Sequence, residues 1–204
     1  MSGRFPLGRG VWHKNGVMAP LTPRRLPPPL TQAALQELAL RYVGKYATTR
    51  AKLRAYLFRK LRERGWNEGA EPDLEGLAER FARAGYIDDA AYALGKSQAL
   101  SARGYGKRRL IQKLQVAGVE EEDGRPARDH ADAEALRAAL RFAERRKLGP
   151  FGPDKLDPKH REKEIAAMIR AGHPFPVAKA ILSCPVGAEV DLREIADRLG
   201  LTLS

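Results

Sequence analysis

The sequence has little of several features that define common classes of protein. It holds a single cysteine, Cys184, which cannot form a disulfide within one chain, so nothing indicates an oxidising compartment. Its four histidines lack the spacing of a metal site, and no apolar run approaches the length that crosses a membrane. The amino terminus has no apolar segment of the kind that a signal peptide needs. We therefore expect a cytoplasmic protein that uses no membrane, metal or other cofactor.

Catalytic patterns are missing as well. No Ser/His/Asp set stands out, and the adjacent Asp88 and Asp89 would point apart at the start of a helix rather than form a catalytic pair. The stretch Arg103–Lys107 lacks the glycine spacing of a phosphate loop and the hydroxyl residue that follows its lysine. We therefore expect that the protein is not an enzyme.

Positive charge, by contrast, is in excess. The chain has 37 lysine and arginine residues against 25 aspartate and glutamate residues, which gives a net charge of +12. A surplus of this size indicates a polyanionic partner, either nucleic acid or an acidic protein surface. Only 7 % of the residues are aromatic, and Leu and Ala dominate the apolar set, as is typical of packed helices.

Residues 1–30 form a segment of their own, which is basic, rich in proline and free of acidic residues. Its prolines exclude regular helix, and the last three favour an extended polyproline conformation. We expect a disordered basic arm. The alternative is an upstream extension without a function, with Met18 as the true start.

From Thr31 onward, apolar residues recur every three or four positions, and no stretch alternates with period two. This pattern predicts an all-α fold. Between 120 and 128 we expect only a short or irregular element. Capping residues, prolines and glycines place the helices at about 31–46, 49–65, 73–85, 88–103, one ending at 118, 132–147, 157–172, 174–183 and 191–199.

Three glycines that end helices, Gly65, Gly118 and Gly172, recur at nearly equal intervals. Aligning them also brings apolar and basic positions into register. The agreement predicts three tandem three-helix repeats that share core with their neighbours in an elongated, curved array. We place the repeats at 31–86, 87–131 and 132–183, followed by an extension with a short helix at 184–204. The basic positions in register are Arg54, Lys107 and Arg161.

Between the third and fourth predicted helices there is almost no loop. Gly85 can adopt the left-handed backbone angles that close a helix, which would let Tyr86 pack back on Phe81. Asp88 is expected to cap the next helix, with hydrophobic residues on both sides of the cap. We refer to this stretch as the corner motif, which consists of Gly85, Tyr86, Ile87, Asp88, Asp89 and Tyr92.

The densest basic stretches lie on the second and fifth predicted helices. On the fifth, Leu110, Leu114 and Ala117 form the buried stripe, so the basic side chains should stand outside the core, within reach of phosphates or carboxylates. The alternative is an ordinary solvated helix face. The candidate binding residues are Arg54, Arg59, Lys60, Arg103, Lys107, Arg108, Arg109 and Lys113.

Taken together, these residues resemble the RecX family of bacterial recombination regulators. The resemblance covers roughly residues 32–183 and departs from the family in the basic arm, in the acidic insertion at 120–128 and after residue 184. It rests on the corner motif with Ala93 after it, on the stretch from Gly104 to Lys113 that leads to Leu114 and Gly118, and on the register of Arg54, Leu57, Leu61 and Gly65.

The resemblance implies a regulator that lodges in the helical groove of the RecA–DNA filament and restrains its ATPase, strand-exchange and coprotease activities. It makes the RecA nucleoprotein filament the expected partner of the candidate basic residues, with single-stranded DNA as a second candidate and a monomer as the acting form. The first alternative is a direct DNA-binding protein whose units act like helix-turn-helix readers. The second is a helical scaffold between other proteins, which leaves the charge unexplained.

Overall fold

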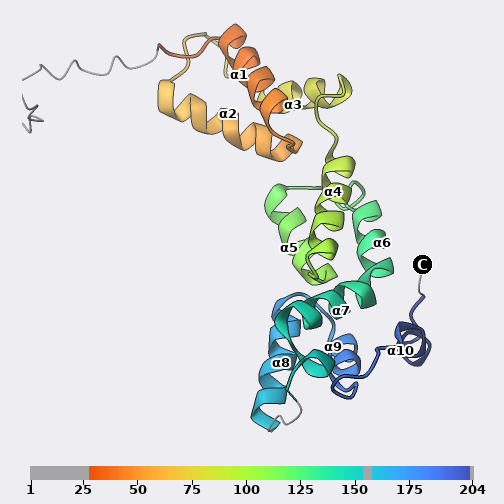
Figure 1. The fold of residues 1–204 in the computed structure, drawn as a ribbon. Helices are drawn as coiled ribbons and strands as arrows, with labels where there is room; N and C mark the ends of the chain where they lie inside the picture. The colour runs from red at the N-terminus through yellow and green to blue at the C-terminus, as the bar shows by residue number, and fades with distance from the viewer. Residues whose placement is uncertain (1–27, 154–157, 203–204) are drawn as a thin grey trace, which may run out of the picture.

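The computed structural model describes residues 28–153 and 158–202, and these ranges contain helices and no β-strand, which confirms the all-α prediction. The elements, in chain order, are α1 (Gln32–Lys45), α2 (Arg50–Arg64), α3 (Leu74–Arg83), α4 (Asp89–Ala102), α5 (Lys107–Ala117), α6 (Arg125–Ala133), α7 (Ala135–Arg146), the 3-10 turn η1 (Gly149–Phe151), α8 (Pro158–Arg170), α9 (Phe175–Leu182) and α10 (Leu192–Leu199) (Figure 1).

The first three helices begin where the sequence supplies a capping side chain. Thr31, Thr49 and Asp73 each accept a hydrogen bond from a backbone N–H of the first turn of α1, α2 and α3. The apolar faces of these helices meet in one core. Its largest buried side chains are Leu30, Leu35, Leu53, Leu57 and Leu77.

The predicted basic arm lies outside the described residues as far as position 27, but its last residue, Leu30, belongs to this core. Leu30 is fully buried, and its backbone N–H donates to the carbonyl of Gly65 at 2.9 Å. The Asn67 N–H donates to the Leu30 carbonyl at 3.0 Å. Arg64 donates from its guanidinium to the carbonyl of Pro28 at 2.8 and 2.9 Å. Residues 28–30 therefore pack with the first three helices rather than belonging to a separate arm.

The second group consists of α4, α5 and α6, and its third helix corrects the sequence prediction. Where we expected a short or irregular element at 120–128 and a longer helix at 132–147, the chain forms the short helix α6 and then α7, with only Glu134 between them. Pro126 lies in the first turn of α6, where a missing N–H leaves no helical hydrogen bond unmade. This proline therefore marks the start of a helix. The apolar core of this group includes Ala93, Leu110, Leu114, Ala127 and Ala131.

The third group consists of α7, α8 and α9. Its core includes Phe142, Met168 and Ile181, and α10 adds Ile195 and Ala196 to the same core. The C-terminal extension thus covers the third group. The predicted boundary at 86/87 lies between α3 and α4, the one at 131/132 lies inside α6, and the one at 183/184 lies just after α9.

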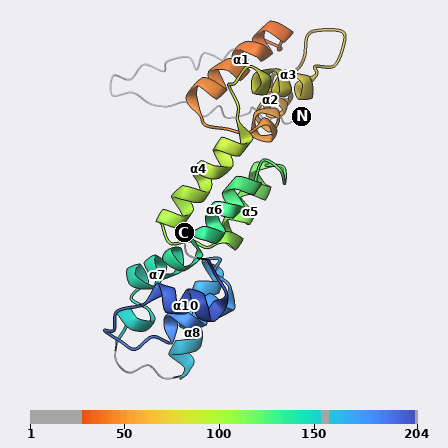
Figure 2. The ribbon, with the colours of Figure 1, turned by 90° about the vertical axis from the view of Figure 1, so that its right-hand side faces the viewer.

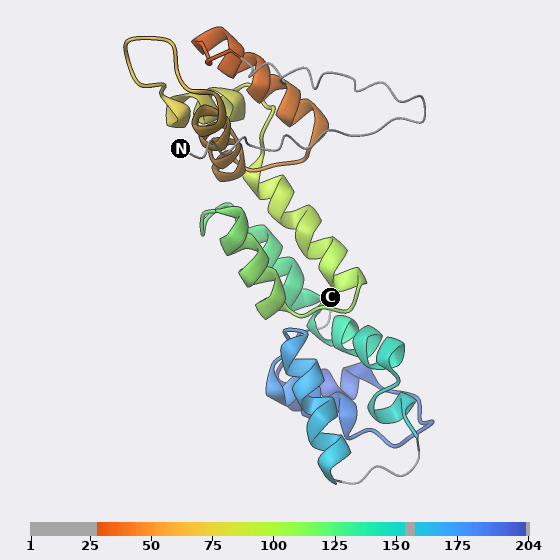
Figure 3. The ribbon, with the colours of Figure 1, turned by 90° about the vertical axis from the view of Figure 1, so that its left-hand side faces the viewer.

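The three groups follow one another along a long axis, in the same order from all three viewpoints (Figures 1, 2 and 3). The array is elongated, as expected for units that contact only their neighbours. The middle helices α2, α5 and α8 lie toward the left of the array in Figure 1. The glycines that follow them, Gly65, Gly118 and Gly172, all have positive φ, at +80°, +66° and +99°. The three groups are hereafter the first, second and third units.

Candidate functional site

The corner between α3 and α4 has the closing geometry that the sequence predicts. Gly85 has a φ of +78°, and its N–H donates to the carbonyl of Ala82 at 2.9 Å. The N–H of Tyr86 donates to the carbonyl of Phe81 at 3.0 Å, and the rings of these two residues lie 5.5 Å apart. This pair of bonds and the ring contact form the motif that ends a helix through a left-handed residue.

The two aspartates of the corner motif have separate roles. Asp88 caps α4 by accepting the N–H of Ala91 at 2.8 Å, as predicted. Asp89 is buried and turns back to α2, where Oδ1 accepts the backbone N–H of Arg50 at 3.0 Å and Oδ2 accepts its Nε at 3.3 Å. The second aspartate therefore connects the second unit to the first. Ile87, which lies between the end of α3 and the cap of α4, is buried in the core of the first unit.

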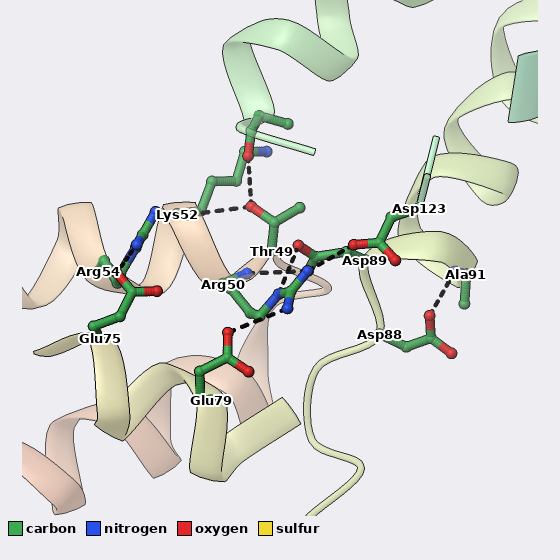
Figure 4. A network of polar contacts seen from close by, with 11 residues as sticks. Thr49, Arg50, Lys52, Arg54, Glu75, Glu79, Asp88, Asp89, Ala91 and Asp123 are labelled. Carbon is green, nitrogen blue, oxygen red and sulfur yellow. Dashed lines mark hydrogen bonds and ion pairs between the residues drawn. The ribbon is translucent and has the colours of Figure 1, made fainter. Parts of the chain in front are cut away.

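Arg50 contacts carboxylates of both units (Figure 4). Besides Asp89, its guanidinium reaches Glu79 of α3 at 3.1 Å and Asp123, just before α6, at 2.6 Å. Burial alone would lower the pKa of Arg50, but the hydrogen bond with Asp89 and the charges of the three carboxylates outweigh it and raise that pKa. Arg50 is therefore a permanent cation that links the first unit to the second.

Two more polar contacts cross the same boundary. The hydroxyl of Thr49 donates to the carbonyl of Ala117 at 2.6 Å, and the Lys52 ammonium donates to the hydroxyl of Tyr92 at 2.5 Å. Tyr92 of the corner motif is thus a contact between units. We refer to this set as the polar junction, which consists of Thr49, Arg50, Lys52, Glu79, Asp89, Tyr92 and Asp123.

The boundary between the second and third units is built from closely packed backbone instead. The N–H of Gly106 donates to the carbonyl of Ala171 at 3.0 Å, and a Cβ on Gly106 would lie 2.3 Å from the carbonyl oxygen of Gly172. His173 is buried and donates from Nε2 to the carbonyl of Gly104 at 3.0 Å. Burial lowers the pKa of His173 by more than this hydrogen bond raises it. We call this boundary the glycine junction.

The predicted cations of α2 fall on two sides of the helix. Arg54 pairs with Glu75 of α3. Arg59 and Lys60 lie on the side toward α1, and both pair with Glu63, at 3.7 and 2.5 Å. The structure therefore does not gather these three candidate residues into one patch.

The predicted cations around α5 stand outside a buried stripe of Leu110, Leu114 and Ala117, as expected. Lys107 pairs with Asp132 of α6 at 2.5 Å, and the Arg109 guanidinium lies 5.9 Å from the ring centre of Tyr105. The remaining candidates are exposed and form no ion pair with any residue that the structure describes. They are Arg103, Arg108 and Lys113.

Lys107 and Arg108 also border a groove of about 420 Å³ at the glycine junction. Its walls are mainly apolar and include Ile111, Ile169 and the half-exposed Phe175. An apolar floor with a cationic rim has the composition of a protein-binding surface, in which an aromatic side chain sits within a polar border. The basic face of α5 therefore continues into a surface suited to protein as well as phosphate.

The described ranges hold neither a candidate metal cluster nor a membrane-spanning helix. Within 28–153 and 158–202, no group of three or more His, Cys, Asp or Glu residues could hold a metal ion. No helix in those ranges is long and apolar enough to cross a bilayer.

The chain is similar to known regulatory proteins over most of its length. The regulatory protein RecX of Myxococcus xanthus is 32 % identical over 184 residues, which cover 85 % of this chain and 95 % of that protein. The chain belongs to the RecX family. The RecX protein of Agrobacterium fabrum is 31 % identical over 139 residues, 66 % of this chain and 74 % of that protein. No family model matches the chain.

The crystal structure of RecX from Lactobacillus salivarius has the same fold. It superposes with a TM-score of 0.54 at 15 % identity and covers 74 % of this chain and 93 % of that one.

Sequence reasoning missed the role of Arg50 in this RecX-family chain. Its partner Asp89 lies 39 positions away and Asp123 lies 73 positions away, so no local pattern connects them. The one available signal was the acidic run that precedes α6, because clustered carboxylates need cations from elsewhere in the fold.

Proposed function

We propose that this protein is a non-enzymatic regulator of RecA. As a monomer it lodges in the helical groove of the RecA–DNA filament and lowers the ATPase, strand-exchange and coprotease activities of RecA. The observation that carries this proposal is membership of the RecX family. The alignment covers 95 % of a relative named as a regulatory protein, at 32 % identity.

The arrangement of the units supports the proposal. An elongated body of three linked units offers an extended surface that can contact more than one subunit of a filament. The exposed cations on α5 suit the phosphates of the enclosed DNA, and the groove beside Phe175 suits RecA protein. A filament presents both kinds of surface at once.

The direct test is a titration of the single-stranded-DNA-dependent ATPase of RecA, taken from the same source, with this protein. We expect the ATPase rate to fall at substoichiometric to equimolar ratios. Strand exchange measured in parallel should fall over the same range. An ATPase rate that stays constant over a wide titration would contradict the proposal.

A triple variant tests the surface on α5. Replacing Arg108, Arg109 and Lys113 by alanine should leave melting nearly unchanged, because these side chains lie outside the core. Filament binding should weaken and its salt dependence should flatten, since fewer counterions are released. Arg193→Ala on α10, an exposed cation remote from α5 in sequence, serves as a control and should bind as the parent does.

Direct DNA binding is the second candidate, and the exposed cations on α5 favour it. Salt titrations of binding to the filament and to bare DNA separate the two. Tighter binding to the filament supports the regulator, whereas equal affinity for bare DNA would replace it with the DNA-binding protein.

A further inference from the structure

A groove of about 540 Å³ lies between α1 and α2 at the N-terminal end of the array. It is far along the chain from the basic face of α5, and only two of its residues were candidates from the sequence. We refer to it as the tyrosine groove, which is lined by Tyr42, Lys45, Tyr46, Tyr56, Arg59 and Lys60.

Three aromatic rings lie in contact in this groove, two of them stacked and the third tilted against the pair. The rings of Tyr42 and Tyr56 lie 4.2 Å apart at an angle of 13°, so α1 and α2 meet through stacked faces. Tyr46 leans on Tyr42 at 5.4 Å and 52°, and it is 50 % exposed at the rim. The stack therefore ends in an aromatic ring that is open to a ligand.

Cations surround the stack. The Lys45 ammonium lies 5.4 Å from the ring centre of Tyr46, and the Arg59 guanidinium and Lys60 ammonium lie 5.6 and 6.0 Å from that of Tyr56. Arg41 adds a fourth cation at the border.

Two carboxylates partly balance these cations. Glu37 pairs with Arg41, and Glu63 pairs with Arg59 and Lys60. All of these pairs are solvent-exposed and worth little, so a phosphate can displace them at small cost. The groove thus keeps a net positive charge next to its aromatic stack.

A ligand that matches this groove must carry flat aromatic faces and regularly spaced negative charges. Single-stranded nucleic acid has both, because its bases are unstacked from a partner strand and its phosphates follow at each residue. Duplex DNA hides its base faces, and an acidic protein segment offers charge without a planar face. Stacking on aromatic side chains beside a cationic track is the usual design of sites that bind single strands without reading sequence.

We propose that the tyrosine groove binds single-stranded DNA, with a base stacked against Tyr46 and the flanking phosphates held by Lys45, Arg59 and Lys60. The inference rests on the proposed function in one respect only, the choice of DNA as the nucleic acid. It adds a DNA contact on the first unit, separate from the surface on α5.

The experiment measures the binding of this protein alone, without RecA, to a fluorescein-labelled oligothymidylate by fluorescence anisotropy. Tyr46→Ala should weaken binding about tenfold or more, which is the usual loss for one stacked base. Tyr46→Phe keeps the ring and should bind as the parent does. Phe58→Ala is the matched control, because Phe58 is 57 % exposed on α2 but does not line the groove.

Several outcomes would overturn the inference. They are equal affinity for Tyr46→Ala and Phe58→Ala, loss of binding in Tyr46→Phe, or no oligonucleotide binding by the parent. A Tyr46→Ala variant that keeps its oligonucleotide affinity but binds DNA-free RecA less well would assign the groove to an acidic protein surface instead. Circular dichroism checks that each variant is folded, which we expect because Tyr46 is half-exposed at the end of α1.

Failure of this inference is distinguishable from failure of the proposed function. If the parent lowers RecA ATPase but Tyr46→Ala binds the oligonucleotide normally, only the groove assignment fails. If the parent leaves RecA ATPase unchanged but Tyr46→Ala loses the oligonucleotide, only the regulatory function fails.

Discussion

Replacing Arg50 by alanine should loosen the first unit from the second. The Arg50 side chain is 24 % exposed and contacts three carboxylates, of which Glu79 and Asp123 are partly exposed and can be hydrated once it is gone. Asp89 cannot be hydrated in this way, because its side chain is only 3 % exposed. Removing one partner of a buried ion pair costs about 3–5 kcal/mol, since the other charge is left buried.

The expected loss is smaller than that range for a structural reason. Asp89 retains one hydrogen bond in the variant, because it also accepts the backbone N–H of residue 50 at 3.0 Å. The junction is also close enough to solvent for water to enter. We therefore expect Arg50→Ala to lower the free energy of unfolding by about 2–3 kcal/mol.

Arg54→Ala is the matched control, because Arg54 lies on the same helix and its ion-pair partner among the described residues is the exposed Glu75 of the first unit. Its loss should cost no more than about 0.5 kcal/mol. Urea denaturation followed by far-UV circular dichroism measures both variants, and hydrogen exchange should show α1–α3 opening sooner in Arg50→Ala. If the two variants are equally stable, Arg50 does not hold the units together and the reasoning is refuted.

Three further predictions concern single residues and can be measured by the same denaturation assay. Gly106→Ala should lower the free energy of unfolding by about 1–3 kcal/mol, because the added Cβ would lie 2.3 Å from the backbone of the third unit. Gly95 lies within α4 with no atom near its missing Cβ, so Gly95→Ala should instead stabilise the chain by up to about 1 kcal/mol. Burial holds the pKa of His173 below its ordinary value of 6.5, so the folded state favours the neutral ring. The free energy of unfolding should therefore keep its full value above pH 6.5 and fall as the pH drops through the folded pKa. His173→Gln should lose this pH-dependent part of the stability. Asp88→Ala should cost about 1 kcal/mol through the lost cap of α4, and Gly85→Val should cost more, because a β-branched residue resists a φ of +78°.

Local signals account for most of what the sequence predicted correctly. The caps at Thr31, Thr49, Asp73 and Asp88 act within one turn of their own helices, so the sequence carries them directly. The glycines that end α2, α5 and α8 need positive φ for reasons equally local. These signals gave the helices, and their spacing indicated the three-unit pattern.

Contacts between distant residues could not be predicted in the same way. The candidate cations of α2 were grouped by their closeness in sequence, but Arg54 faces α3 while Lys60 faces α1. The tyrosine groove was missed because its stack pairs Tyr42 with Tyr56, two residues on different helices whose pairing depends on how α1 packs against α2. Which side of a helix a cation faces depends on how the helices pack, and the order of charges along the chain does not reveal this.

The two junctions differ in physical character, and this difference bears on how such an array fits a helical groove. The polar junction combines two hydrogen bonds that involve backbone groups, from Thr49 to Ala117 and from the Arg50 N–H to Asp89, with ion pairs of long side chains that can rotate and be screened by salt. A methyl group on Gly118 would also clash at the first boundary, with Ala51 at 2.3 Å, but only at the glycine junction do backbone atoms meet backbone atoms this closely, and there α4 and α6 also pack against α7. Bending should therefore concentrate between the first and second units, while the second and third move as one body. In the proposed complex, this arrangement would let the tyrosine groove adjust to the path of a DNA strand while the surface on α5 keeps a fixed relation to the groove beside Phe175.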